Sequence, residues 1–116
     1  MSYRVMISNQ AEKDLRAIFS YIAFDLQSLE NAEAQLDRLE KQIASLDQFP
    51  LRFRRFEVEP WFARGLRYFP VDNYCVFYLP NVENNTVTII RVLYAGSDME
   101  RTLQFTLLPD NPAANA

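Results

Sequence analysis

The sequence predicts an α+β domain in which a two-helix antiparallel hairpin packs on an antiparallel β-sheet, and three observations predict it. Residues 64–94 contain three runs rich in Val, Ile, Tyr, Phe and Thr, which is typical of strands joined by hairpins. Residues 9–46 contain two stretches with the apolar spacing of helices. The elements follow one another in the order β-α-α-β-β-β-β-α, which favours helices on one face of the sheet.

The composition is that of one ordinary globular domain. The chain has 116 residues, 49% of them hydrophobic and 23% charged, which is enough for one core but not for two. No apolar stretch approaches the roughly 18 residues that span a membrane, and the N-terminus lacks the apolar segment of a signal peptide. We therefore expect a cytoplasmic protein. The chain has no histidine and one cysteine, which excludes zinc sites and histidine-based triads, and we expect no cofactor.

Residues 3–8 alternate apolar and polar side chains, which predicts a short edge strand. The helix that follows is expected to begin at Asn9, because asparagine is a favourable capping residue. This helix should bury one stripe of apolar side chains. The stripe contains Ala11, Leu15, Ile18, Phe19, Ile22 and Leu26.

A second helix is expected after Ser28, which can cap it. Its apolar residues recur every three or four positions and form a seam that suits an antiparallel partner helix. The seam contains Leu29, Ala32, Leu36, Leu39, Ile43 and Leu46. Packing within the chain explains this seam better than a coiled-coil dimer does, because the seam is short. The helix should end at Phe49 and Pro50, since proline cannot continue it.

Residues 74–79 should form the central strand of the sheet, because their side chains are apolar on both faces. The single cysteine, Cys75, lies in this strand and is expected to be a small buried hydrophobic residue. Residues 72–73 and 80–85 should form the connections on either side. A short edge strand is expected at residues 56–59, before the turn formed by residues 60–62.

The C-terminal part is expected to be less regular. Residues 98–107 predict a short helix with Met99, Leu103 and Leu107 on one face. Residues 108–116 contain two prolines and no periodicity, which predicts a flexible tail. The single domain should therefore span residues 1–107.

Positive charge is concentrated in residues 51–70, which we call the basic band. These residues hold five arginines and two glutamates, although the net charge of the chain is −3. The arginines are Arg52, Arg54, Arg55, Arg64 and Arg67, and the glutamates are Glu57 and Glu59. The band could bind an anionic partner, or it could pair with acidic groups of its own chain, and composition does not separate these alternatives.

Arg67 and Arg91 interrupt two of the apolar strands. An arginine in a strand must reach either solvent or a partner, because burying its charge unpaired is costly. If both point to the same open sheet face, they form a clamp for a phosphate or a carboxylate group. Arg91 has a structural alternative, which is an ion pair with Asp98 or Glu100. We expect the five arginines of the basic band, together with Arg91, to be the binding residues.

Several segments of the chain occur in an order that is typical of one family. They are YRVMIS, AEKDL, LDQFP, RGLRYFPVDNYCVFY, TIIRVLY and DMERTL, and they extend over residues 3–104. The sequence thereby resembles the RelE/ParE superfamily of toxins, the toxin halves of bacterial type II toxin–antitoxin modules, often described as plasmid stabilization proteins. The resemblance implies a small sheet with a helix hairpin, growth inhibition by the free protein, and a cognate antitoxin that neutralises it in a hetero-oligomer.

The superfamily contains two activities, and the residues favour one of them. The resemblance implies that RelE-like members cleave messenger RNA on the ribosome with basic residues and sometimes a tyrosine, whereas ParE-like members act on DNA gyrase. Arg67 matches one of the RelE-type basic positions. Arginine is replaced at two others by Cys75 and Ser97, and the tyrosine position falls near Leu103. Many ParE-like members also have an arginine at the position of Ser97. We therefore favour a ParE-like action directed at gyrase.

The catalytic residues, if any, remain open at this stage. Arg67 and Arg91 are weak candidates that could stabilise charge, but neither is a convincing base. Glu57 and Glu59 are possible bases, although ion pairing with the basic band is a simpler explanation of both. Tyr68 and Tyr94 are possible acids, although cross-strand packing explains them better. Two alternatives stay in view: a RelE-like ribosome-dependent endoribonuclease, and a degenerate scaffold that binds a partner without toxicity.

Overall fold

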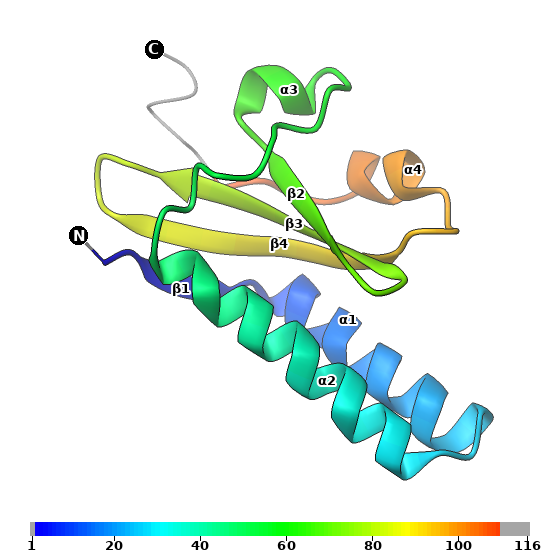
Figure 1. The fold of residues 1–116 in the computed structure, drawn as a ribbon. Helices are drawn as coiled ribbons and strands as arrows, with labels where there is room; N and C mark the ends of the chain where they lie inside the picture. The colour runs from blue at the N-terminus through cyan, green and yellow to red at the C-terminus, as the bar shows by residue number, and fades with distance from the viewer. Residues whose placement is uncertain (1, 110–116) are drawn as a thin grey trace.

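A computed structural model describes residues 2–109 and confirms the α+β fold class (Figure 1). Four strands form one sheet in the order β1-β4-β3-β2, with bounds Arg4–Ile7 (β1), Arg67–Val71 (β2), Tyr74–Asn81 (β3) and Thr86–Tyr94 (β4). Two long helices lie against one face, with bounds Asn9–Ser20 (α1) and Leu29–Ala44 (α2). Two short helices lie on the other face, with bounds Trp61–Arg64 (α3) and Met99–Gln104 (α4). No helix within the described residues is long and apolar enough to cross a membrane.

The N-terminal strand lies at the edge of the sheet, as predicted, but its direction differs from the expectation. β1 pairs in parallel with β4, so the sheet is mixed, whereas β2, β3 and β4 form the predicted antiparallel meander. The N–H groups of Arg4 and Ser8 donate to the carbonyl oxygens of Asn85 and Ile89 at 2.9 and 3.0 Å. Alternation along a strand indicates which side chains are buried, but it does not indicate which way the neighbouring strand runs.

The sheet is covered on both faces, and each face has its own hydrophobic core. The first core lies between the sheet and the helix hairpin, and its largest members are Leu39, Leu46, Phe69, Tyr78 and Ile89. The second core lies on the opposite face, under α3 and α4, and its members are Phe56, Trp61, Leu66, Cys75, Phe77, Leu79, Ile90, Leu93 and Leu103. The central strand β3 supplies both cores, which confirms that it is buried on both sides.

The helix hairpin forms as predicted, with three corrections. Ser8, not Asn9, caps α1, because its hydroxyl oxygen accepts a hydrogen bond from the N–H group of Ala11 at 3.1 Å. Ser28 caps α2 as expected. Leu26 and Leu29 are 55% and 57% exposed, so they do not belong to the buried stripes. The reason is that the end of the hairpin projects beyond the sheet, where no second layer covers these side chains (Figure 1).

The predicted edge strand at residues 56–59 does not form. A single bridge pairs Arg55 with Arg67, and the N–H group of Phe56 donates to the carbonyl oxygen of Leu66 at 2.8 Å. Phe56 and Trp61 instead turn into the second core, which bends the chain away from the sheet. Pro80, expected in a loop, is part of β3.

The C-terminal helix is shorter than predicted. α4 ends at Gln104, and Leu103 is buried as expected, but Leu107 is 94% exposed. Leu108 packs against the second core. The carbonyl oxygen of Pro109 accepts a hydrogen bond from Arg64 at 3.3 Å. The rest of the predicted flexible tail, residues 110–116, lies outside the described residues.

β4 has one residue more than β3 across the middle of the sheet. Phe77 lies opposite Arg91 and Tyr78 lies opposite Ile89, so Ile90 has no partner residue and the strand bulges. Phe77 belongs to the second core and Tyr78 to the first. A bulge re-aims the side chains that follow it, and here it carries Arg91 out of the first core to the edge of β4.

The seam of the second helix generates a test of the first core. Leu39 is fully buried in α2, so Leu39→Asp should lower the free energy of unfolding by more than about 3 kcal/mol, a large part of a usual total of about 5–15 kcal/mol. Leu36→Asp should cost less, because Leu36 is only half-buried. Gln42→Asp, on the exposed side of the same helix, is the control, and chemical denaturation measures all three. Equal stabilities of the Leu39 and Gln42 variants would contradict this packing.

Candidate functional site

The basic band lies beside β2, and its first residues alternate between the two faces of the sheet. The ring of Phe53 stacks on Phe69 in the first core, with 4.4 Å between the ring centroids. The guanidinium group of Arg54 lies over the ring of Tyr68, 5.3 Å from its centroid. Tyr68 packs against the second core. The first part of the band therefore follows the outer edge of the sheet and exposes Arg52, Arg54 and Arg55 there.

Arg52 stabilises the chain after α2. Its Nη1 group donates to the carbonyl oxygen of Gln48 at 2.6 Å and to that of Phe49 at 3.2 Å, and its Nη2 group donates to the hydroxyl of Ser45 at 2.8 Å. The same guanidinium group lies 4.6 Å from the centroid of the Phe53 ring. These carbonyl groups follow the last turn of α2 and of the short 3₁₀ segment after it, where a cation is favourable. Arg52 is thus first of all a structural residue.

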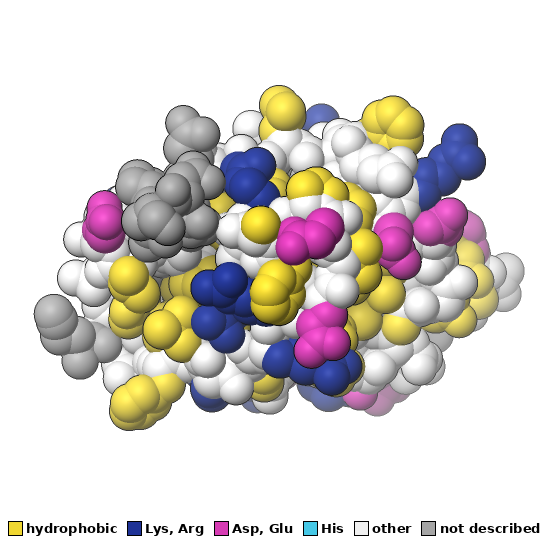
Figure 2. All heavy atoms as spheres, turned by 90° about the horizontal axis from the view of Figure 1, so that it is seen from above, with side chains coloured by type: hydrophobic (Ala, Val, Ile, Leu, Met, Phe, Trp, Pro, Cys, Tyr) yellow, Lys and Arg dark blue, Asp and Glu magenta, His cyan; other side chains and the backbone are white. Residues whose placement is uncertain are grey.

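Arg54 and Arg55 are exposed, and each rests on an aromatic ring. The Nη2 group of Arg54 donates to the hydroxyl of Tyr68 at 2.6 Å. Arg55 lies 5.6 Å from the centroid of the Phe62 ring and donates to the carbonyl oxygen of Phe62 at 3.3 Å. We call these four residues the arginine–aromatic strip. Figure 2, which looks onto the face with α3 and α4, shows arginine and lysine side chains interleaved with hydrophobic ones.

The positive charge of the basic band has no acidic partner within residues 2–109. The three ion pairs in this part of the chain join Arg38 to Asp72, Lys41 to Asp37, and Arg91 to Asp14. Among the described residues, none of the five arginines of the band lies within 4.0 Å of a carboxylate oxygen. Glu59 accepts a hydrogen bond from the N–H group of Ala63 at 2.9 Å instead. The expected ion pairs with Glu57 and Glu59 are therefore absent from the described residues, and the charge of the band is available to a partner.

Arg67 is half-buried and holds the start of the basic band in place. Its Nη1 group donates to the carbonyl oxygen of Phe53 at 2.6 Å and to that of Leu51 at 3.3 Å, whereas its Nε group has no partner. Burial lowers the pKa of Arg67, and the nearby Arg55 lowers it further, while the phenol of Tyr78 acts in the opposite direction. Arginine remains charged at neutral pH all the same. Substitution of Arg67 therefore removes a structural anchor as well as a charge.

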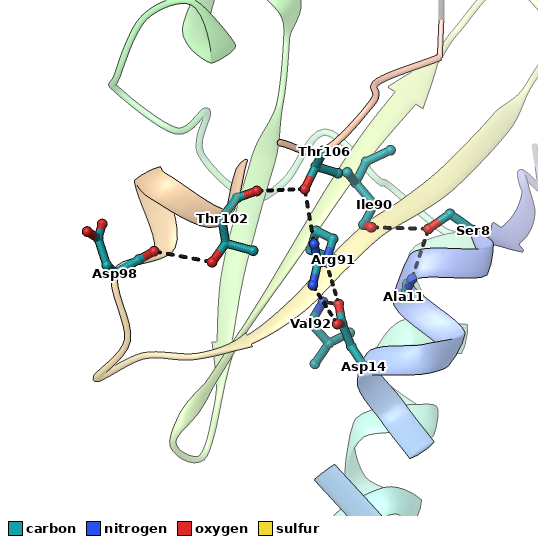
Figure 3. Close-up of polar contacts among 9 residues, drawn as sticks. All are labelled: Ser8, Ala11, Asp14, Ile90, Arg91, Val92, Asp98, Thr102 and Thr106. Atoms are coloured by element: carbon teal, nitrogen blue, oxygen red, sulfur yellow. Dashed lines mark hydrogen bonds and ion pairs between the residues drawn. The ribbon is translucent and has the colours of Figure 1, made fainter. Parts of the chain in front are cut away.

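Arg91 forms a buried ion pair with Asp14 of α1 (Figure 3). Its Nε and Nη2 groups donate to the two carboxylate oxygens at 2.7 Å each, and the two side chains are only 15% and 12% exposed. Asp14 also accepts the backbone N–H group of Val92 at 2.9 Å. Nη1 of Arg91 donates to the hydroxyl of Thr106 at 3.1 Å. The partner of Arg91 is therefore Asp14. The partners expected from the sequence were Asp98 and Glu100.

Arg67 and Arg91 do not form the expected clamp. Arg67 lies opposite Tyr78 in the neighbouring strand, and Arg91 lies opposite Phe77. Residues directly opposite each other project to the same face, whereas Tyr78 and Phe77 are consecutive and project to opposite faces. Arg67 thus lies on the side of Tyr78, whereas Arg91 binds Asp14 at the edge of β4, and each guanidinium group is bound to groups of its own chain.

The positions that match RelE-type catalytic residues are mostly buried or bound to groups of the chain. Cys75 and Leu103 are buried in the second core, and burial raises the pKa of the Cys75 thiol. Ser97 is exposed, but its hydroxyl donates to the carbonyl oxygen of Tyr94 at 2.6 Å. Of the two proposed acids, Tyr68 accepts a hydrogen bond from Arg54, and Tyr94 is exposed. The second sheet face is filled with apolar side chains instead of being open.

The sequence interpretation missed Ser8 and Asp14, which join α1 to β4. The hydroxyl of Ser8 caps α1 and also donates to the carbonyl oxygen of Ile90 at 3.1 Å (Figure 3). Asp14 lies in α1, and its side chain is only 12% exposed. Its burial could have been inferred from its spacing, because it precedes the buried Leu15 and follows Ala11 by three positions on the helix.

The chain was compared with protein families and with solved structures. The family described as "ParE toxin of type II toxin-antitoxin system, parDE" matches residues 5–99. No curated protein matches the chain. The chromosomal ParDE system from P. aeruginosa is 18% identical with a TM-score of 0.67, and the match covers 80% of this chain and 96% of that one.

Two further structures have the same fold. The toxin–antitoxin complex RelBE2 from Mycobacterium tuberculosis is 22% identical with a TM-score of 0.57, and the match covers 81% of this chain and 99% of that one. The archaeal RelE–RelB complex from Pyrococcus horikoshii is 20% identical with a TM-score of 0.56, and the match covers 83% and 98%. At these identities the similarity establishes the fold alone.

The Asp14–Arg91 pair generates a test of the buried network. Asp14→Ala leaves Arg91 buried without a counter-charge, so it should lower the free energy of unfolding by about 3–5 kcal/mol. Asp37→Ala removes an exposed partner of Lys41 and should cost less than about 1 kcal/mol. Chemical denaturation of both variants measures the difference. A cost for Asp14→Ala no larger than that for Asp37→Ala would mean that Arg91 is solvated in solution.

Proposed function

Because the chain belongs to the ParE toxin family of type II toxin–antitoxin systems, we propose that it inhibits growth by acting on DNA gyrase and does not cleave RNA. A toxin of this kind acts in the cytoplasm, where its target lies. The observation that carries the proposal is the second core, which occupies the sheet face that RNA cleavage would need.

The chemistry of RNA cleavage supports the same conclusion. Attack by the 2′-hydroxyl needs a base, a group that stabilises negative charge, and an acid that protonates the leaving oxygen. Arg91 is neutralised by Asp14, and the Arg67 guanidinium is bound to backbone carbonyl groups. Cys75 and Leu103, at two of the RelE-type positions, can neither stabilise charge nor donate a proton to a bound phosphate from inside a core. The described residues therefore offer no convergent acid–base set.

The antitoxin is the partner that the arginine–aromatic strip fits best. The solved structures of similar fold are toxin–antitoxin systems, and this chain has exposed, unpaired arginines beside aromatic rings. Arginines on aromatic rings are held in place, so they lose little conformational freedom when they bind a carboxylate. We infer that acidic residues of the antitoxin bind this strip in a hetero-oligomeric complex.

The target is tested by two assays on one protein. Expression in growing bacterial cells should arrest growth, and the purified protein should inhibit gyrase supercoiling. Primer extension on messenger RNA from the same cells should give no cleavage pattern. A cleavage pattern that disappears in a folded Arg67→Ala variant would make the protein a RelE-like endoribonuclease with a rearranged site. Normal growth with no effect in either assay would identify a binding scaffold without toxicity.

The antitoxin site is tested by reversing charge. Arg54→Glu combined with Arg55→Glu should weaken binding of the cognate antitoxin at least tenfold at low salt, and it should reduce the salt dependence of binding. The control is Arg4→Glu combined with Lys13→Glu, which changes the net charge equally at exposed positions away from the strip. Calorimetric titration measures both variants. Equal affinities of the two double variants would exclude the strip from the interface.

A further inference from the structure

A second site on this chain lies between the helix hairpin and the end of the sheet where β2 turns into β3. It is a pocket of about 700 Å³. Its apolar aliphatic lining residues, which we call the floor, are Ala17 and Ile18 of α1, Ile22 and Leu26 of the chain that follows α1, and Ala34 of α2. We call its polar lining residues the rim. Tyr21, Tyr74 and Tyr94 stand around it, and we call it the tyrosine pocket. Figure 1 shows the hairpin extending away from the sheet on this side.

The hydroxyl groups of the three tyrosines have no hydrogen-bond partner within residues 2–109. The two tyrosine hydroxyls that are engaged in this range belong to Tyr68 and Tyr78. The rings of Tyr74 and Tyr94 are in edge-to-face contact, with 6.1 Å between their centroids. Burial raises the pKa of Tyr74, and the neighbouring Tyr21 and Tyr94 raise it further. Tyr74 is therefore a hydrogen-bond donor throughout the neutral pH range.

The remaining rim of the pocket also offers donors. Arg38 and Gln35 both donate to a single carboxylate oxygen of Asp72, at 2.7 and 2.9 Å. This carboxylate fixes the two side chains and holds the Nε group of Arg38, but the terminal nitrogens of that guanidinium group have no partner in the described chain. The residues that line the pocket include no Asp or Glu. The groove on the other side of the hairpin, by contrast, is lined by Glu12 and Glu40 as well as by Arg16.

Gly96 sets the position of one tyrosine ring. A Cβ atom at this residue would lie 2.5 Å from Cε2 of Tyr94 and 3.0 Å from its Cζ atom, closer than atoms can approach. Only glycine therefore allows the ring of Tyr94 to fold back over the chain. Tyr94 is 56% exposed, so its ring could move aside without disturbing either core.

The chemistry of the pocket favours a protein segment over a nucleic acid. Apolar walls with clustered tyrosines are typical of the buried anchor points of protein interfaces. Nucleic acids bind chiefly through phosphate contacts to several cations, and the one cation here, Arg38, already faces Asp72. Unpartnered donors around an apolar floor fit an apolar side chain that is followed or preceded by a carboxylate.

The pocket and the arginine–aromatic strip lie at opposite ends of β2. β2 begins at Arg67, beside the strip. It ends at Val71, and Asn73, two residues further on, lines the pocket. A strand of this length spans about 17 Å, a distance that a few residues of extended chain can cover. The strip lies on the α3/α4 side of the sheet and the pocket on the hairpin side, so one continuous segment of a partner can reach both places by passing around the outer edge of β2.

We propose that the tyrosine pocket is a second anchor site for the antitoxin, which inserts an apolar side chain there and places an adjacent carboxylate on the tyrosine hydroxyls. This inference rests on the proposed toxin–antitoxin function and adds to it a site separate from the arginine–aromatic strip. The pocket binds an apolar side chain of the antitoxin, whereas the arginines of the strip bind its acidic residues.

The test fills the pocket and compares it with a matched substitution. Ala34→Phe places a large side chain in the pocket, and Ala44→Phe places the same side chain on the exposed surface of the same helix. The probe is the full-length cognate antitoxin, and calorimetry measures its binding to the full chain. Ala34→Phe should weaken binding at least tenfold, whereas Ala44→Phe should bind as the wild type does. Thermal melting checks that both variants are folded.

Two milder variants test the tyrosines themselves. Tyr21→Phe combined with Tyr94→Phe should weaken binding about tenfold through the loss of two hydrogen bonds, while Tyr3→Phe, outside the pocket, should have no effect. Gly96→Ala should also weaken binding, because it displaces the ring of Tyr94, with little change in melting temperature.

The outcomes separate this inference from the proposed function. If the wild-type protein does not bind the antitoxin, the proposed partnership fails, and this inference fails with it. If the wild type binds and Ala34→Phe binds equally well, the pocket is excluded and the partnership stands. A labelled single-stranded oligonucleotide is the competing probe. Its binding to the wild type, if lost in Ala34→Phe, would overturn the assignment of the pocket to a protein segment.

Discussion

The contact between Asp14 and Arg91 is the interaction on which the arrangement of the layers depends. β1 ends at Ile7, so the part of β4 beyond Ile89 has no neighbouring strand on that side. An exposed strand edge presents backbone groups that need partners. Ser8 and Asp14 provide them from α1, by bonding to the backbone of Ile90 and Val92. Because the same carboxylate holds Arg91, and Arg91 holds Thr106, one ion pair joins the hairpin, the sheet and the chain that follows α4 (Figure 3).

The fold could be predicted from the sequence because its signals are local. The spacing of Leu39 and Ile43 predicts a helix with one buried side, and the unbroken apolar run of β3 predicts a central strand. The parallel pairing of β1 could not be predicted, because it depends on how far the hairpin carries the chain before β2 begins. The missing strand at residues 56–59 has a similar cause. The apolar residues of this segment turn into the second core from a bend in the chain. Residue type alone does not distinguish apolar residues in such a bend from apolar residues in a strand.

The site was harder to predict, for a reason that applies to arginine in general. The sequence indicated where the positive charge lies, and the exposed, unpaired Arg54 and Arg55 agree with a binding surface. The sequence did not indicate that Arg52 and Arg67 would donate hydrogen bonds to backbone carbonyl groups, since those contacts depend on how the loop folds. Nor did it indicate Asp14 as the partner of Arg91, because 77 residues separate the two in the chain. The tyrosine pocket likewise joins residues from both helical segments and two strands.

The bulge in β4 makes this strand sensitive to its length as well as to its residue types. With Ile90 as the extra residue, Arg91 lies opposite Phe77 and reaches the edge of the sheet. If the pairing continued from Tyr78 and Ile89 without the bulge, Arg91 would lie opposite Val76, a residue of the first core, and its guanidinium group would turn toward Leu39 and Tyr78. Insertion of a further residue between Ile89 and Val92 would shift the end of the strand and separate Val92 from Asp14. Relatives of this chain should therefore vary in length at the Asn81–Asn85 turn, where side chains are largely exposed, and keep the number of residues between that turn and Arg91 constant.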